Sequence, residues 1–157
     1  MILRKLRGEN VDDYVDDVLK EIDKKIKDWK KDLSLNAKNI QLANVEQVSL
    51  LSYYDEIRVD TKSLLEYYEM KVKQVRSEAL HNINKYSVKD HNSMEKDKMI
   101  DSDKTFLKYK QIYLDVYEMY NMLSSISEQF KNRAFMLNNI IKIRTAALED
   151  ITLYDDA

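Results

Sequence analysis

The sequence predicts an all-α protein built from long amphipathic helices, and two observations lead to that prediction. The 157 residues include a single glycine, Gly8, and neither proline nor cysteine. Sheets and nucleotide-binding loops need residues that tolerate unusual backbone angles at their turns, whereas helices do not. Apolar residues also recur every three or four positions along most of the chain, which is the spacing of one helix face.

Length and charge narrow the class of protein further. A chain of this length fits one helical domain, residues 1–157, with a modest core. The 26 Lys+Arg balance 28 Asp+Glu, so the formal net charge is -2 and an anionic partner must meet a local basic patch. No window approaches the ~18 continuous apolar residues of a membrane span. We therefore expect a soluble intracellular protein, and the lack of cysteine suits a reducing compartment.

The first part of the chain predicts a flexible basic N-terminus, residues 1–10, followed by one helix from Val11 to Leu33. Aspartates lie near the start of this helix and lysines near its end, as the helix dipole favours. Its apolar stripe consists of Val11, Val15, Val18, Ile22, Ile26, Trp29 and Leu33.

The middle of the chain is less regular. Asparagines at 36, 39 and 44 suit turns or caps, and Asn44 suits the start of a short helix that reaches Tyr54. A second long helix is expected to begin at Asp60, or at the capping box that Ser63 and Glu66 form, and to end near Ser87. Residues 88–102 are almost entirely polar, so we expect a mobile loop there.

Residues 103–148 predict a long C-terminal helix. Asp101, Ser102 and Asp103 offer capping side chains, and apolar residues continue at helical spacing to Leu148. Serines at 124, 125 and 127 bend such a helix without stopping it, so the segment is either one helix of about 45 residues or a helix pair. One helix would span roughly 65 Å, more than a compact domain of this size covers. We expect an elongated protomer that forms a homo-oligomer, and a self-contained antiparallel bundle is the alternative. Residues 149–157 form an acidic tail.

No catalytic constellation is recognisable. The two histidines, His81 and His91, lie apart, and no cysteine is present to act as a nucleophile. Glu78 and His81 make the sole Glu-x-x-His match, whereas a di-metal bundle needs two. Gly8 stands alone, so a glycine-rich phosphate loop is absent from the sequence. We expect a protein that is not an enzyme and needs no cofactor or metal.

The C-terminal helix also predicts an interface between subunits. No acidic residue lies between Gln129 and Leu148, and two basic stripes flank one apolar seam there. Arginines beside such a seam either clamp carboxylates across an interface, for which the acidic tail is available, or bind phosphates. We expect Phe130→Asp to disrupt assembly by burying an unpaired charge. The expected interface residues are Phe130, Lys131, Arg133, Ala134, Phe135, Leu137, Ile140, Ile141, Arg144 and Leu148.

Lysines on the second long helix fall into two groups. Lys62 and Lys73 have Glu66 and Glu69 at the four-residue spacing of surface ion pairs. Lys85 and Lys89 have no such partner, so they are better candidates for binding a nucleic-acid backbone. Tyrosines stack on unpaired bases in some proteins, but at helical spacing they more often pack at the edge of a core.

The C-terminal half resembles the UvsY-type phage recombination mediators. The resemblance lies in Asp103-Lys-Thr-Phe-Leu-Lys108 and, at fixed distance, in the segment Phe130–Arg144. It is ungapped from Asp103 to Leu148 and extends more loosely back to Trp29. Its most specific part is Lys131-x-Arg133-x-Phe135-x-Leu137-x-x-Ile140-x-x-x-Arg144.

The resemblance implies a function. Members of that family form rings, and the resemblance implies a homo-oligomeric ring of roughly six to seven subunits for this chain. They bind single-stranded DNA and help a RecA-like recombinase replace the phage single-strand-binding protein, in the cytoplasm of the infected bacterium. The family's Lys-x-Arg pair falls on His81 and Ile83, so the DNA contact is expected to spread over Lys71, Lys73, Arg76, His81, Lys85 and Lys89. The alternatives are a structural coiled-coil adaptor that does not bind nucleic acid and, less favoured, a carboxylate-metal enzyme.

Overall fold

The computed structural model describes residues 11–35, 40–87 and 90–155. Within these ranges every regular element is a helix, which confirms the all-α fold class. The expected basic N-terminus, residues 1–10, lies outside the described residues, and so do the side chains of the acidic tail. The elements are α2 (Val11–Ile26), α3 (Trp29–Leu33), α4 (Ile40–Tyr86), α5 (Ser93–Asp101) and α6 (Lys104–Asp155).

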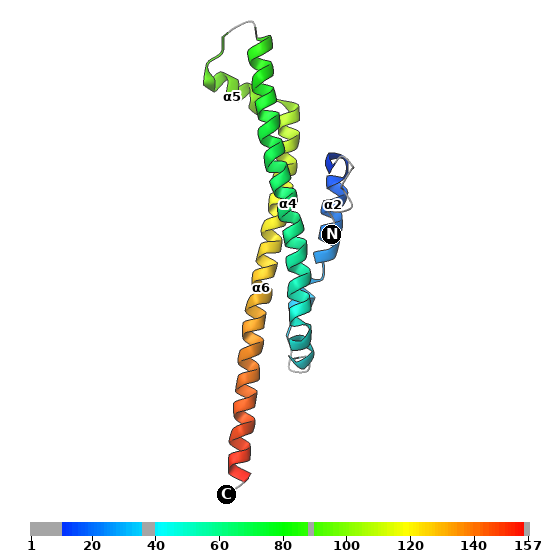
Figure 1. Ribbon diagram of the computed structural model, residues 1–157, viewed down its shortest axis with the longest axis vertical. Helices are drawn as coiled ribbons and strands as arrows, with labels where there is room; N and C mark the ends of the chain where they lie inside the picture. The colour runs from blue at the N-terminus through cyan, green and yellow to red at the C-terminus, as the bar shows by residue number, and fades with distance from the viewer. Residues whose placement is uncertain (1–10, 36–39, 88–89, 156–157) are drawn as a thin grey trace.

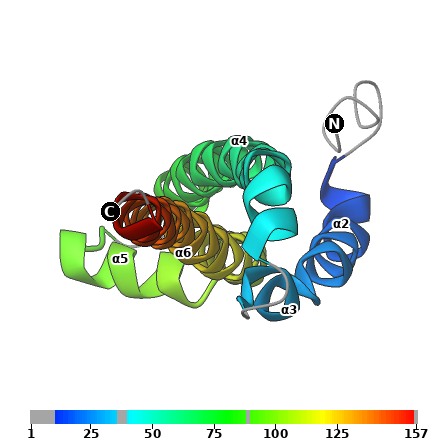
Figure 2. The same cartoon turned by 90° about the horizontal axis from the view of Figure 1, so that it is seen from below.

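Two long helices form the body of the protein. α4 has 47 residues and α6 has 52, and they run antiparallel side by side (Figure 1). α6 continues past the N-terminal end of α4 and ends on its own. α5 packs at the far end of the pair, where α4 ends and α6 begins, while α2 and α3 lie on the opposite side (Figure 2). The molecule is therefore an elongated hairpin of two helices with short helices attached.

The buried residues of α4 follow the alternating three- and four-residue steps of a coiled coil. α6 contributes residues at similar steps, and α2 closes the core from one side. The main core consists of Val15, Val18, Ile22 and Ile26 of α2, Tyr54, Ile57, Leu64 and Tyr68 of α4, and Val116, Leu123, Ile126 and Phe130 of α6.

α4 is continuous from Ile40 to Tyr86, so the expected short helix near Asn44 and the new start at Asp60 or Ser63 were wrong. Two polar residues occupy buried positions of its coiled-coil stripe. Gln47 donates a hydrogen bond to the backbone oxygen of Phe130, and the Thr61 hydroxyl donates to the carbonyl of Ile57. These contacts satisfy both side chains, so the helix continues through positions at which the apolar pattern lapses.

The N-terminal helix is shorter than expected, because α2 ends at Ile26 and α3 is a separate turn. The backbone oxygen of Asp28 accepts hydrogen bonds from the N–H groups of Lys31 and Asp32. The break lets Trp29 and Leu33 pack against the same core from a second helix axis. The stripe was identified correctly, but it is divided between two helices.

The mobile loop expected at residues 88–102 was also wrong over most of its length. α5 begins with a capping box, in which Asn92 and Glu95 each accept a hydrogen bond from the other's backbone N–H. Its buried residue Ile100 packs against Val75 and Phe106. An Asn-x-x-Glu capping signal and one apolar side chain were sufficient for this short helix.

Tyrosine hydroxyls attach α2 and α3 to the long pair. The Tyr54 hydroxyl donates to Asp32 Oδ2 at 2.8 Å, and its ring stacks on Phe130 with centroids 4.8 Å apart. The Tyr109 hydroxyl donates to Asp12 Oδ2 at 2.7 Å. Burial raises the pKa of Tyr54 and Tyr68 well above the ordinary 10.0, and the neighbouring carboxylates Asp32 and Asp12 act in the same direction.

These raised pKa values predict loss of stability at alkaline pH. A tyrosine whose pKa is higher in the folded state binds its proton more tightly there, so its full contribution to stability is present below about pH 10. The contribution decreases as the pH rises from 10 toward the folded-state pKa. We expect Tyr54→Phe to flatten the fall in unfolding free energy between pH 9 and 11, measured by urea titration. The exposed Tyr117→Phe is the control, and an equal effect of the two changes would contradict this assignment.

Candidate nucleic-acid interface

Three of the six expected DNA-binding residues already have carboxylate partners. Lys73 Nζ lies 2.7 Å from Glu69 Oε1, as the spacing predicted, and Arg76 Nη2 lies 2.8 Å from Asp97 Oδ1 of α5. Lys71 Nζ lies 3.7 Å from the largely buried carboxylate of Asp12 in α2. Such pairs lower the net positive charge of the α4 surface that carries Lys71, Lys73 and Arg76. Exposed ion pairs are worth about 0–1 kcal/mol, so a phosphate can still compete for Lys73 and Arg76.

The last turns of α4 carry the remaining candidates. His81 and Lys85 are exposed, and their four-residue spacing places them on one face of the helix. The Lys85 ammonium lies 5.1 Å from the centroid of the Tyr86 ring, within cation–π range. Within the described ranges neither His81 nor Lys85 forms an ion pair. Lys89 lies outside the described residues.

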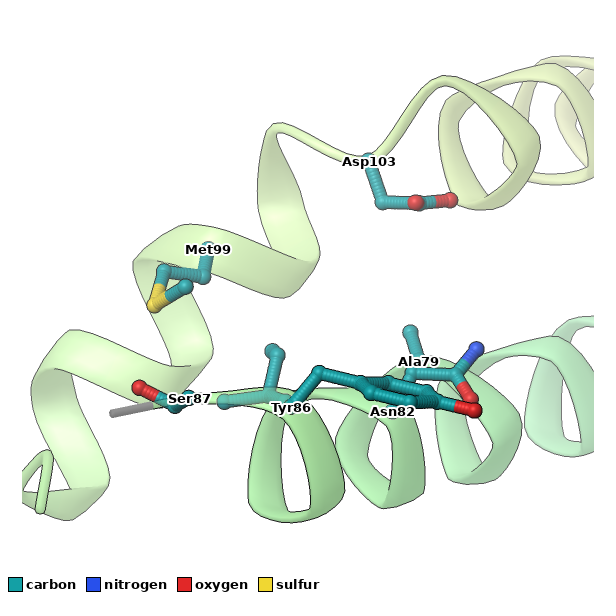
Figure 3. Close-up of a pocket in the computed structure, with 7 residues that line it drawn as sticks. Ala79, Asn82, Tyr86, Ser87, Met99 and Asp103 are labelled. Carbon is teal, nitrogen blue, oxygen red and sulfur yellow. The ribbon is translucent and has the colours of Figure 1, made fainter. Parts of the chain in front are cut away.

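A hollow of about 420 Å³ lies between the end of α4 and α5 (Figure 3). Tyr86 lies along its α4 wall with the ring beside Asn82, and Met99 of α5 faces it from the other side. Tyr86 is 70% exposed, so its ring is accessible to a flat ligand. The volume is within the roughly 300–1,000 Å³ of small-ligand pockets. The lining residues are Ala79, Asn82, Ile83, Tyr86, Ser87, Met99 and Asp103.

Asp103 gives the hollow an electrostatic gradient. It caps α6, because its Oδ1 accepts a hydrogen bond from the backbone N–H of Phe106 at 2.8 Å, as the capping prediction required. Its carboxylate lies at the junction of α5 and α6, across the hollow from the α4 wall. A phosphate is disfavoured beside Asp103 and favoured beside Lys85. The hollow itself suits an uncharged, flat group. Sequence reasoning missed it because α5 had been expected to be a loop.

The C-terminal seam is used differently from the expectation. Phe130, Arg133 and Leu137 were expected to contact another subunit, but they are buried within the protomer. Leu137 packs against Ile40 and Ala43 at the start of α4. Phe130 and Leu137 are completely covered within the protomer and have no surface to offer another subunit, whereas Arg133 is 4% exposed and lines two hollows.

The other expected interface residues remain on the surface or at its edge. Phe135 is 67% exposed, and Lys131 and Arg144 are exposed as well. Ala134, Ile140 and Ile141 are half-buried, while the side chain of Leu148 lies outside the described residues. Nearby exposed apolar side chains are Leu42, Val45 and Val48 of α4 and Met136 and Ile143 of α6. An apolar surface therefore exists at this end of the pair, beside the buried seam.

No group of three or more metal-ligating side chains occurs among the described residues. None of the helices, in the ranges that the structure covers, is both long and apolar enough to cross a membrane. A scan against protein-family models, a search of curated proteins and a search of solved structures each found no significant match to this chain.

Proposed function

We propose that the protein is a recombination mediator that binds single-stranded DNA as a homo-oligomer. It promotes loading of a RecA-like recombinase in place of the phage single-strand-binding protein, within the infected bacterial cell. One observation carries the DNA contact: the exposed Lys85 ammonium lies 5.1 Å from the centroid of the exposed Tyr86 ring, which lines the hollow, and His81 is exposed one turn earlier on α4. The motif in residues 103–148 supports the role in recombination.

The proposed contact combines stacking with charge. A base stacks on Tyr86 in the hollow, and the adjoining phosphate lies by Lys85 and His81, on the side away from Asp103. Stacking of one base on an aromatic ring contributes about 1–3 kcal/mol. A subunit with one such contact binds weakly, but copies that share one strand bind it with a high effective concentration. An oligomer that holds the strand in a shape its competitor binds poorly favours recombinase nucleation.

The test is a titration of a fluorescent oligonucleotide at several salt concentrations. The logarithm of the binding constant should fall linearly with the logarithm of salt concentration, with a slope of about -0.7 per neutralised phosphate. Lys85→Glu should weaken binding about tenfold, or 1.4 kcal/mol. Lys62→Glu is the matched control, because it makes the same charge change on α4 at a lysine 3.8 Å from Glu66. Equal losses in the two variants, or binding that does not depend on salt, would refute the proposal.

A structural coiled-coil adaptor is the second candidate. The coiled-coil pairing of α4 with α6, and the carboxylates that already pair with Lys71, Lys73 and Arg76, favour it. Measurements on the unsubstituted protein distinguish the two candidates, because an adaptor forms oligomers without binding oligonucleotides even at low salt. Sedimentation with and without labelled DNA therefore separates them.

A further inference from the structure

We infer that Arg133 is a binding site for a carboxylate supplied by the C-terminal end of α6 from a second copy of this chain. The inference rests on the homo-oligomer of the proposed function and names a contact within it. Arg133 is 4% exposed, and no carboxylate of the described residues forms an ion pair with it. An unpaired buried guanidinium is costly, so a bound anion would stabilise this site.

Neutral partners occupy only one side of the guanidinium. Arg133 Nη1 donates to the Gln47 side-chain oxygen and, at 3.3 Å, to the backbone oxygen of Ala43. Arg133 Nε is buried and has no hydrogen-bond partner. Burial lowers the pKa of Arg133, while the charges of Glu46 and Asp32 act in the opposite direction. Nε is therefore a buried donor of the guanidinium for which the described residues supply no acceptor.

Arg133 lines two hollows, and only one of them suits an anion. The first, about 570 Å³, is also lined by Asp32 and Glu46, which repel a second negative charge. The other, about 430 Å³, is lined by no acidic residue among those described. It presents the amide side chains of Gln129 and Asn132, which can donate hydrogen bonds to a carboxylate. Leu33, Leu35 and Met136 supply apolar walls.

The surroundings favour a protein carboxylate over a nucleic-acid phosphate. Met136, which lines this hollow, is 55% exposed, and the next residue back along α6, Phe135, is 67% exposed. A phosphate backbone keeps its charge in water and gains nothing from these apolar side chains, whereas a helix bearing both apolar and acidic residues fits them. The acids that line the neighbouring hollow would also repel an extended polyanion.

The end of α6 has the matching chemistry. Residues 142–147 are exposed throughout, and Ile143 is 69% exposed. The sequence continues with Leu148, Glu149, Asp150 and Ile151, so two acidic residues lie between two apolar ones there. Residue 149 lies about 24 Å along the same helix from residue 133, at 1.5 Å per residue. This end therefore cannot reach Arg133 of its own chain, but that of a second copy can.

Such a contact joins two different surfaces of the chain. Each protomer offers its Arg133 hollow to one neighbour and its α6 end to the other. Head-to-tail contacts of this kind close into a ring when the rotation between subunits permits it. The contact therefore accounts for assembly although Phe130, Arg133 and Leu137 are buried within the protomer.

The test measures self-association by sedimentation velocity over a range of protein concentrations. Arg133→Gln should weaken association at least tenfold, because a neutral amide replaces the buried charge. Glu149→Gln combined with Asp150→Asn should do the same without touching the protomer core. Asp115→Asn, at an exposed position of α6, is the control and should leave association unchanged. Parental association in the double variant would overturn the inference, even if Arg133→Gln failed to fold.

Mixing the two defective proteins gives a sharper result. At a protein concentration at which each variant alone is monomeric, a one-to-one mixture should form dimers, because one intact hollow and one intact α6 end remain available. Failure to form dimers would overturn the head-to-tail contact. If the unsubstituted protein associates but binds no oligonucleotide, the DNA-binding proposal is refuted, whereas the head-to-tail contact is not. Loss of DNA binding with unchanged association in Arg133→Gln would instead assign Arg133 to nucleic acid and overturn the inference.

Discussion

Replacing Phe130 by alanine should lower the free energy of unfolding by about 3–5 kcal/mol, the usual cost of deleting a buried aromatic side chain. Phe130 is completely buried, and its ring stacks on Tyr54. Its backbone oxygen also accepts the hydrogen bond from Gln47 at 2.7 Å. The substitution opens a cavity at the point where α4 and α6 meet. Urea denaturation followed by helical circular dichroism would measure the loss.

Phe135→Ala is the matched control for this prediction. It makes the same change five residues later on α6, where the side chain is 67% exposed. We expect its effect on the unfolding free energy to stay within about 0.5 kcal/mol. The reverse order of the two effects would place Phe130 in a subunit interface, as the sequence had suggested. Phe130→Asp should accordingly unfold the protomer itself, because the buried charge would have no partner.

Replacing Ser125 by proline should lower the free energy of unfolding by at least about 3 kcal/mol, because Ser125 lies in the interior of α6. Proline has no N–H to donate to the carbonyl of residue 121, and its ring clashes with that carbonyl. The flanking residues Leu123 and Ile126 are both buried against the core. A kink between them would separate part of α6 from α4. Thermal and urea unfolding would both record the loss.

Ser125→Ala separates the effect of the backbone from that of the side chain. It removes only a weak contact, in which the Gln129 amide donates to the Ser125 hydroxyl at 3.3 Å. Because alanine favours a helix slightly more than serine, we expect a change within about 0.5 kcal/mol. Equal stability of the proline and alanine variants would mean that the helix is interrupted near the serines, as in a helix pair.

Contacts between neighbours in sequence were the predictable part of the candidate site. The pairs of Lys62 with Glu66 and Lys73 with Glu69 were expected from four-residue spacing, and the structure confirms both. The partners of Lys71 and Arg76 lie on other helices, so no spacing rule could find them. The hollow beside Tyr86 depends in the same way on the position of α5.

The boundaries of α4 illustrate a second limit. The coiled-coil stripe passes through Gln47 and Thr61, which are polar yet buried. Apolar periodicity leaves such residues out of the core stripe, because the side chain alone does not reveal whether a hydrogen-bond partner will be present. Gln47 finds its partners on α6, at Phe130 and Arg133.

By itself, the sequence determined that this protein is helical and that its helices are long. The lack of proline, the single glycine and the three- to four-residue spacing of apolar side chains act locally, within each segment. Only the tertiary structure decided which faces are covered. Phe130 and Leu137 were expected in a seam between subunits, but α4 covers them within one protomer. The physical reason is that a side chain is buried only where two surfaces come into contact. The spacing of apolar residues along one helix does not identify the surface that will cover them.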